Sequence, residues 1–327
     1  MPDTKTTYLG IQLKNPVIIS SSGLTGSLEG VKKAADAGAG GVVLKSLFEE
    51  QISADLDSEN QGADLYNHPE AADYLGQMGM QLGPRDYLSL ISQAKAQTDM
   101  PVLASVNCVG QKWWTEYAKQ LNESGADGLE LNIGLLPRNE DETSQNIEDY
   151  IVHTIDVIAR NLSIPFSVKL GPYFTALPNL ARRIRERGAK GLVLFNRFYQ
   201  FDIDTETESA KAGILYSSPS EYASVLRWIS ILSGRCGMDL CATTGISDSQ
   251  GIIKMLLAGA SAVQVASVVY KEGFPVIATM VEGLEAWMKA KGYASILDFR
   301  ASVSQEQSQT PEVFERLQYI KALTGYS

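Results

Sequence analysis

The sequence predicts a (β/α)8 barrel, in which eight parallel strands alternate with helices around one closed sheet. Four segments repeat a Gly-Ala entry into an apolar strand, at residues 38–45, 125–132, 188–196 and 259–266. Four further apolar strands are expected between them, at 16–20, 101–106, 165–170 and 239–243. Continuously apolar strands are typical of a parallel sheet buried on both faces. Eight of them in one chain fit a closed barrel better than the alternative, an open doubly wound sheet.

Length and charge agree with a single barrel domain over residues 1–327. The chain carries 38 acidic and 28 basic residues, a net charge of −10, and no cluster of Lys and Arg offsets it. This argues against nucleic acid or an anionic membrane as a partner. We also find neither an apolar run long enough to span a bilayer nor the apolar segment of a signal peptide. We therefore expect a cytoplasmic protein.

The residues that usually hold metals are not arranged for it. The three cysteines lack Cys-x-x-Cys spacing, which argues against a zinc or iron–sulfur site and suits reduced thiols: Cys108, Cys236 and Cys241. Four alternating acids lack the glycine turn of an EF-hand and predict a solvated strand face: Asp202, Asp204, Glu206 and Glu208. No metal is expected.

Taken in order, the chain opens with a small hairpin at 6–13, which we expect to plug the lower end of the barrel. The first strand leads into small residues that suit a flat ligand against the backbone: Ser20, Ser21, Ser22 and Gly23. The second strand ends in Lys45 and Ser46. A long loop at 47–83 follows, of a length that usually marks a functional lid or disorder. It holds His68 and Gln77.

Polar residues stand at the C-terminal ends of the next strands, where the active sites of barrels form. They are Asn107, Asn132, Lys169 and Asn196. A second long excursion follows the sixth strand, as far as about residue 219. One rim with this many polar side chains predicts a functional site.

The last strand–helix–strand unit predicts an anion site. Asp248 is the expected N-cap of its helix, and Gly259 is the expected C-cap. Both strands end in small residues, whose backbone N–H groups can approach a bound anion closely. They are Thr244-Gly245 and Ala266-Ser267. In barrels, the loops after strands 7 and 8 often form a phosphate site.

From residue 15 to 293 the chain resembles the dihydroorotate dehydrogenase family of FMN-containing barrels. The matching pieces are Ser21-Ser22-Gly23, Lys45-Ser46, Ser105-Val106-Asn107, Glu130-Leu131-Asn132, Val168-Lys169-Leu170, Leu194-Phe195-Asn196 and the stretch from Thr244 to Ser267. The resemblance implies FMN, with its phosphate held by the N–H groups of Gly245, Ala266 and Ser267. Thr244 stands where the family usually has Gly, so its side chain must point away from the phosphate.

The resemblance also implies roles for the rim residues. Lys45 and Lys169 are expected near the electron-rich edge of the flavin, where a cation stabilises the reduced form. Ser21, Ser22 and Gly23 are expected to pack against the ring. Ser46, Asn107 and Asn132 complete the expected cofactor contacts. The expected substrate contacts are Asn132, Asn196 and Gln77.

The loop after the fourth strand departs from the family. In the family it reads Asn-x-Ser-Cys/Ser-Pro-Asn, and the Cys or Ser removes a substrate proton. Here Leu135 stands at that position, and a Leu side chain cannot accept a proton. Gly76 and Pro137 also replace expected Asn partners of a polar ring, which lowers selectivity for it. The remaining acid or base candidates are Tyr173, Arg197, Tyr199 and His68, and the catalytic residue stays open.

The sequence thus indicates a divergent FMN-dependent oxidoreductase that moves hydride between a CH–CH bond of a small planar substrate and the flavin N5. Dihydroorotate is the nearest named substrate, and another FMN-linked reduction or dehydrogenation is an alternative. Two further classes stay open. One is a flavin-binding or electron-transfer subunit without substrate chemistry, and the other is a phosphate-sugar barrel enzyme without flavin. The substrate, the electron acceptor and the oligomeric state are open, with a homodimer as the candidate assembly.

Overall fold

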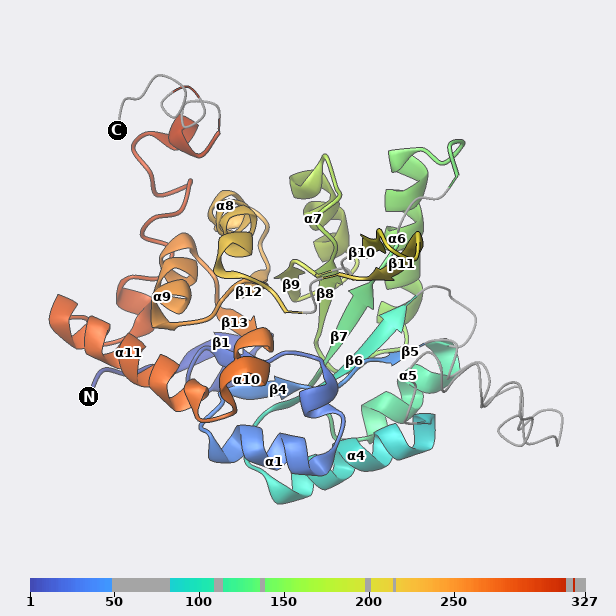
Figure 1. Cartoon of the computed structure of the whole chain (residues 1–327), viewed down its shortest axis with the longest axis horizontal. Coiled ribbons are helices and arrows are strands. Elements are labelled where there is room, and N and C mark those ends of the chain that lie inside the picture. The colour runs from blue at the N-terminus through green and yellow to red at the C-terminus, as the bar shows by residue number, and fades with distance from the viewer. Residues whose placement is uncertain are drawn as a thin grey trace, which may run out of the picture.

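The computed structural model describes residues 1–48, 83–108, 114–135, 139–197, 201–213, 216–315 and 320. Within them, eight parallel strands form a closed ring, which confirms the predicted (β/α)8 barrel (Figure 1). The strands in ring order are β3 (Val17–Ile19), β4 (Gly41–Val43), β6 (Val102–Cys108), β7 (Gly128–Ile133), β8 (Phe166–Leu170), β9 (Gly191–Leu194), β12 (Asp239–Thr243) and β13 (Ala262–Val265). Val263 of β13 pairs with Val17 of β3, and this pairing closes the ring.

Helices cover the outside of the ring, each with its apolar face toward the strands (Figure 1). Those between strands are α1 (Leu28–Asp36), α4 (Pro84–Gln97), α5 (Trp114–Glu123), α6 (Ser144–Ala159), α7 (Leu177–Glu186), α8 (Tyr222–Leu232) and α9 (Ser249–Ala258). After β13 come α10 (Ser267–Glu272) and α11 (Val276–Lys291). Among the described residues, no helix combines the length and the apolar character needed to cross a membrane.

The predicted caps of α9 are confirmed. The Asp248 carboxylate accepts a hydrogen bond from the Gly251 N–H at 2.8 Å, which satisfies one of the free amides at the start of the helix. Gly259 ends the helix with φ +118°, in the left-handed region that a glycine enters without a steric penalty. This helix therefore begins and ends where local sequence directs it to.

The N-terminal hairpin fills the lower end of the barrel, as predicted. Strand β1 (Thr6–Tyr8) pairs antiparallel with β2 (Ile11–Leu13). Tyr8 and Leu9 are buried in a cluster with inward-facing strand residues: Leu13, Ile18, Val43, Leu103, Val193, Cys241 and Ala262. A Cβ atom on Gly191 would lie 2.5 Å from Leu9 Cδ2. The absence of a side chain at Gly191 thus makes room for the hairpin.

The segment that follows β4 begins with a short strand and not with a loop. Leu47 and Phe48, expected in the loop after the second strand, form β5 (Leu47–Phe48) beside Val106 and Asn107. They do so because β6 extends beyond β4 and leaves an edge free for pairing. Residues 49–82 lie outside the described residues. The expected lid with His68, Gln77 and Gly76 is therefore not described.

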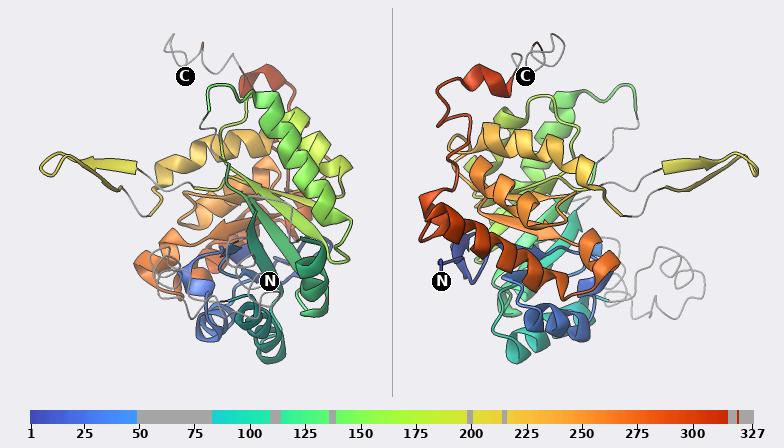
Figure 2. Two further views of the ribbon diagram at one scale, coloured as in Figure 1. Left: turned by 90° about the vertical axis from the view of Figure 1, so that its right-hand side faces the viewer. Right: turned by 60° about the vertical axis from the view of Figure 1, so that its left-hand side comes forward.

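The excursion after β9 contains a second hairpin, β10 (Phe201–Asp204) with β11 (Ser209–Ala212), which projects from the barrel (Figure 2). Its acids are largely exposed, in line with the expected solvated strand. The amides of Thr207 and Glu206 donate to Asp204 and hold the pKa of that carboxyl below its usual value. Within the described part of the chain, no group of three or more His, Cys, Asp or Glu side chains could hold a metal.

Short 3-10 helices complete the described structure. They are η1 (Gly23–Thr25), η3 (Pro219–Glu221), η4 (Ile296–Asp298) and η5 (Pro311–Phe314). The last two follow α11. Cys236 and Cys241 are buried free thiols.

Candidate active site

A cavity of about 240 Å³ opens at the C-terminal ends of β3, β8, β9, β12 and β13. Nine of its lining residues were predicted as site residues from the sequence: Ser21, Ser22, Lys169, Asn196, Arg197, Thr244, Gly245, Ala266 and Ser267. The lining also includes Ser20, Tyr216, Ser217, Gln264 and Tyr270. The strand ends that the sequence singled out therefore converge on one cavity.

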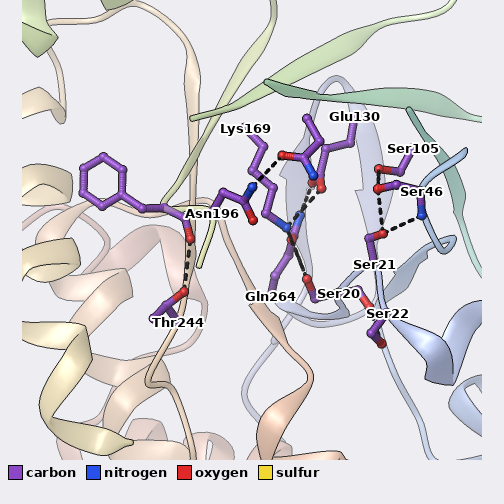
Figure 3. Close-up of polar contacts among 12 residues, drawn as sticks. Ser20, Ser21, Ser22, Ser46, Ser105, Glu130, Lys169, Asn196, Thr244 and Gln264 are labelled. Atoms are coloured by element: carbon purple, nitrogen blue, oxygen red, sulfur yellow. Dashed lines mark hydrogen bonds and ion pairs between the residues drawn. The ribbon is translucent and has the colours of Figure 1, made fainter. Parts of the chain in front are cut away.

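A buried polar network forms the floor of this cavity (Figure 3). The Lys169 ammonium donates to Gln264 Oε1 at 3.1 Å, to Glu130 Oε1 at 3.2 Å and to Ser20 Oγ at 3.3 Å. The side chains of Lys169 and Glu130 are 7% and 1% exposed. Because they come from neighbouring strands, β8 and β7, the register of the sheet brings these two charges together.

Gln264 links the two ends of this network. Its Nε2 donates to Glu130 Oε2, while its Oε1 accepts from Lys169 and, at 3.1 Å, from Ser20 Oγ. Every polar atom of this amide that faces the network thus has a partner of the right kind. A fully satisfied buried network of this sort fixes its members in one arrangement.

A chain of hydroxyl groups stands beside the floor (Figure 3). Ser21 Oγ lies 3.0 Å from Ser46 Oγ, which lies 2.8 Å from Ser105 Oγ. The Tyr87 hydroxyl accepts from the Ser105 N–H at 2.7 Å and donates to the Ser105 carbonyl at 3.0 Å. Burial raises the pKa of Tyr87, so the phenol stays neutral and can make both bonds.

The loops after β12 and β13 form the far wall of the cavity. Thr244 has φ +77° and Gly245 has φ +79°, and the Thr244 hydroxyl turns away to donate to the Phe195 carbonyl at 3.0 Å (Figure 3). The Gly245 N–H donates to Ser217 Oγ at 3.2 Å. Ser217 in turn donates through its N–H and its hydroxyl to Ser267 Oγ, each at 3.0 Å. Backbone amides and hydroxyl groups therefore gather at this wall.

The rim of the cavity carries aromatic rings and an ion pair. The rings of Tyr216 and Tyr270 lie 5.4 Å apart and are tilted by 32°. Arg197 Nε lies 2.9 Å from Glu221 Oε2. Partial burial acts to raise the pKa of the Glu221 carboxyl, but the Ser218 amide and Arg197 outweigh it, so that pKa lies below its usual value.

Two of the predicted substrate residues meet at the rim. Asn196 Nδ2 donates to Asn132 Oδ1 at 2.9 Å, which joins the end of β9 to β7. Asn196 lines the cavity, whereas Asn132 lies behind it as its hydrogen-bond partner. Gln77, the third predicted substrate residue, lies outside the described residues.

Several predicted residues do not line the cavity among the described residues: Gly23, Lys45, Ser46, Asn107 and Asn132. Gly23 lies against the lining residue Tyr270, and Ser46 is hydrogen-bonded to the lining residue Ser21. The Lys45 stem lies against Gly26, where an added Cβ would be 3.2 Å from Lys45 Cδ. Of the two lysines predicted near the flavin, the cavity thus includes Lys169 and not Lys45.

Of the acid and base candidates, one lines the cavity, one does not, and two are not described. Arg197 lines the cavity, whereas Tyr173 is 63% exposed and lies outside its lining. Tyr199 and His68 lie outside the described residues. Leu135 is half-buried and packs against the apolar core. Its side chain is thus part of the packing.

Sequence reasoning missed Glu130 and Gln264 as site residues. Each is a single polar residue between two aliphatic ones, in Leu129-Glu130-Leu131 and in Val263-Gln264-Val265. Such a residue in a continuously apolar strand is costly to bury without partners. This pattern could have identified both. Ser217 and Tyr270 carry no comparable pattern.

The lining as a whole suits an anionic ligand. Among its described residues are two cations, Lys169 and Arg197, together with hydroxyl groups and backbone amides, and no carboxylate. This composition is unusual in a chain with a net charge of −10. Hydroxyl and amide donors near a cation are the groups that hold a phosphate or another anion.

Comparison with known proteins agrees with this arrangement. Residues 3–288 match the sequence profile of the family described as dihydroorotate dehydrogenase. A protein of Aeropyrum pernix, whose name assigns it to dihydroorotate dehydrogenase A (fumarate), is 25% identical over 91% of this chain and 96% of its own length. The dihydroorotate dehydrogenase B (NAD(+)) catalytic subunits of Pyrococcus abyssi and Pyrococcus furiosus are 28% and 27% identical. These matches cover 88% and 89% of this chain, and 94% and 96% of the two relatives.

The profile spans most of the chain, and the fold is the one that the resemblance implied. The chain therefore belongs to the dihydroorotate dehydrogenase family, whose members are flavin-dependent oxidoreductases that act on CH–CH bonds.

Proposed function

We propose that the cavity at the ends of β3, β8, β9, β12 and β13 binds FMN, and that the protein oxidises or reduces a CH–CH bond of a small planar molecule. The observation that carries the proposal is the lining itself. It pairs a buried cation with a wall of hydroxyl groups and amides, and its described residues include no carboxylate. A phosphate at one end and a polar ring at the other match this distribution of donors.

The residues divide into a phosphate end and a ring end. The N–H groups of Gly245, Ala266 and Ser267 would hold the phosphate, assisted by the Ser217 and Ser267 hydroxyls that already meet there. Lys169, Ser21 and Ser22 would lie along the ring. When bound, FMN supplies the group that accepts or donates hydride. The protein orients that group and places the Lys169–Glu130 ion pair beneath it.

The chain handles the second proton differently from the family pattern. Leu135 cannot take up a proton, and its side chain packs against the apolar core. Arg197 is the predicted candidate that lines the cavity, but its guanidinium stays protonated and its Nε is bonded to Glu221. We therefore propose that dihydroorotate is a poor substrate and that the preferred one needs less assistance from a base.

The cofactor proposal is tested with purified protein. We expect a yellow protein that releases FMN, and not FAD, on denaturation, because the described lining has one phosphate wall and no second unit for an adenosine. Apo-protein titrated with FMN should regain the bound-flavin spectrum. Colourless protein that also fails to bind added FMN would contradict the proposal.

A second function is favoured by Leu135 alone. A flavin-binding electron-transfer subunit would need no proton acceptor. The two functions differ in one measurement. Reduction of bound FMN by any CH–CH substrate, with the isolated chain under anaerobic conditions, supports the oxidoreductase. Flavin that is reduced only by another protein supports the subunit.

A further inference from the structure

We propose that Glu130 is a positioning residue that fixes Lys169 and offsets its positive charge, so that the cavity floor is a neutral ion pair. The inference rests on the proposed function, since the charge it describes acts on FMN. A lone buried cation would strongly favour the reduced, more negative cofactor. The Glu130 carboxylate moderates that effect and sets the reduction potential lower than Lys169 alone would.

The Lys169–Glu130 pair is buried, and burial strengthens its electrostatic effect on the cavity. Glu130 is 0% exposed as a residue and its side chain is 1% exposed, so water does not screen it from its neighbours. Lys169 Nζ lies 3.2 Å from Glu130 Oε1. In such an environment a unit charge acts over a longer distance than at the surface. Removing one partner therefore changes the field felt at the cavity floor.

The hydrogen bonds identify the charge state of Glu130. Its Oε1 accepts from Lys169, and its Oε2 accepts from Gln264 Nε2. Both oxygens act as acceptors, as those of a carboxylate do, whereas a protonated carboxyl would carry an O–H for which these two contacts offer no acceptor. The ionised form is the one that satisfies both contacts. The floor therefore holds one positive and one negative charge.

The same bonds fix the lysine. An ammonium group has three N–H donors, and those of Lys169 go to Ser20, Glu130 and Gln264. The acceptors come from β7, β13 and the end of β3, on different sides of the barrel interior (Figure 3). The ammonium is held from these sides beneath the cavity. Glu130 is the charged member of this set of acceptors.

The test measures the FMN midpoint potential in four proteins and a control. Glu130→Gln keeps the shape and removes the negative charge, so reduced FMN should bind about tenfold more tightly relative to oxidised FMN. That change corresponds to a rise of about 30 mV for a two-electron couple. Lys169→Met should shift the ratio about tenfold the other way. The double variant has no charge left and should return to within about threefold of wild type.

Glu148→Gln serves as the matched control. Glu148 is also a buried glutamate paired with a cation, Arg183, but it lies on α6 outside the barrel. The FMN midpoint potential of Glu148→Gln should equal that of the wild type. Breaking a buried pair is destabilising, so each single variant is at risk of not folding, whereas the double variant leaves no unpaired charge. If Glu130→Gln does not fold, the difference in potential between Lys169→Met and the double variant measures the effect of removing the Glu130 charge.

The outcomes separate the inference from the function it rests on. A rise in Glu130→Gln with recovery in the double variant supports charge balance. A fall in Glu130→Gln would mean that Glu130 only holds Lys169 in place, and an unchanged potential would mean that it has no influence; either result overturns the proposal. Wild-type protein that binds no FMN would instead refute the proposed function.

Discussion

The Thr244 hydroxyl donates a hydrogen bond to the Phe195 carbonyl at 3.0 Å and so ties the end of β12 to the end of β9. Thr244 also has φ +77°, a region in which a β-branched residue is a clear outlier. That conformation costs about 1–2 kcal/mol, and the hydrogen bond returns about 1 kcal/mol. The strain and the bond nearly balance, which explains how Thr is tolerated where the family usually has Gly.

Thr244→Val should therefore be more harmful than Thr244→Gly. The valine keeps the strained conformation and leaves the Phe195 carbonyl without this donor, so the free energy of unfolding should fall by about 1–2 kcal/mol. The glycine loses the bond but also the strain, and should stay within about 1 kcal/mol of wild type. Urea unfolding measures both. Equal stability of the valine variant and the wild type would show that the bond contributes nothing.

The stability cost of a substitution at Gly23 should depend on the hydroxyl group of Tyr270. A Cβ on Gly23 would lie 2.7 Å from the Tyr270 hydroxyl but 4.0 Å from its Cζ. Gly23→Ala alone should lower stability by about 1–3 kcal/mol through overpacking. In the Tyr270→Phe background the same change should cost far less, because the obstructing oxygen is gone. Thermal unfolding of the four proteins measures this. Equal costs in both backgrounds would contradict the contact.

The sequence predicted what depends on local pattern and missed what depends on register. Asp248 and Gly259 carry their cap preferences in their own residue types, and both act as predicted. Glu130 and Gln264 lie 134 residues apart, and only the closed ring brings them together. Lys45 and Lys169 look alike as strand-end lysines, yet one lies against Gly26 and the other under the cavity. Chain position alone cannot distinguish them.

Stability should fall at high pH because two tyrosines are buried. Burial raises the pKa of Tyr8 well above its usual value, and the charges of Cys241 and Glu130 add to this; burial also raises the pKa of Tyr87. Above about pH 10 the unfolded chain releases these protons while the folded protein keeps them. The free energy of unfolding should then drop by about 1.4 kcal/mol per pH unit for each tyrosine.

Tyr8→Phe should remove the contribution of one tyrosine to the pH dependence of the free energy of unfolding. Urea unfolding between about pH 10 and 11.5 measures the slope, and the difference between variant and wild type isolates Tyr8 from the buried thiols. We expect the variant's decline to be shallower by about 1.4 kcal/mol per pH unit. Parallel curves for the two proteins would show that Tyr8 ionises as readily in the fold as in the unfolded chain.

Dihydroorotate should reduce the flavin slowly. A positioned base usually contributes about 10²–10⁴-fold in rate, and Leu135 cannot supply one. Stopped-flow mixing of holoprotein with dihydroorotate under anaerobic conditions follows the bleaching, with dithionite as the control that the flavin is reducible. Leu135→Cys should rescue little, because Gly134, Leu136 and Pro137 also depart from the motif that the resemblance implies. Bleaching within about a second, the timescale of ordinary turnover, would mean that another residue acts as the base.

The N-terminal hairpin has a consequence for how the protein is made. The Leu9 N–H donates to Asp239, 230 residues later, and the Thr6 hydroxyl donates to the Ser261 carbonyl, 255 residues later. At about 5–20 residues per second of synthesis, roughly ten to fifty seconds pass before these partners leave the ribosome. Tyr8 and Leu9 are translated long before the last strands, yet they have no binding site until those strands emerge. The barrel is thus sealed only after its last strands emerge, and a chain released before that point leaves the apolar residues of the hairpin uncovered.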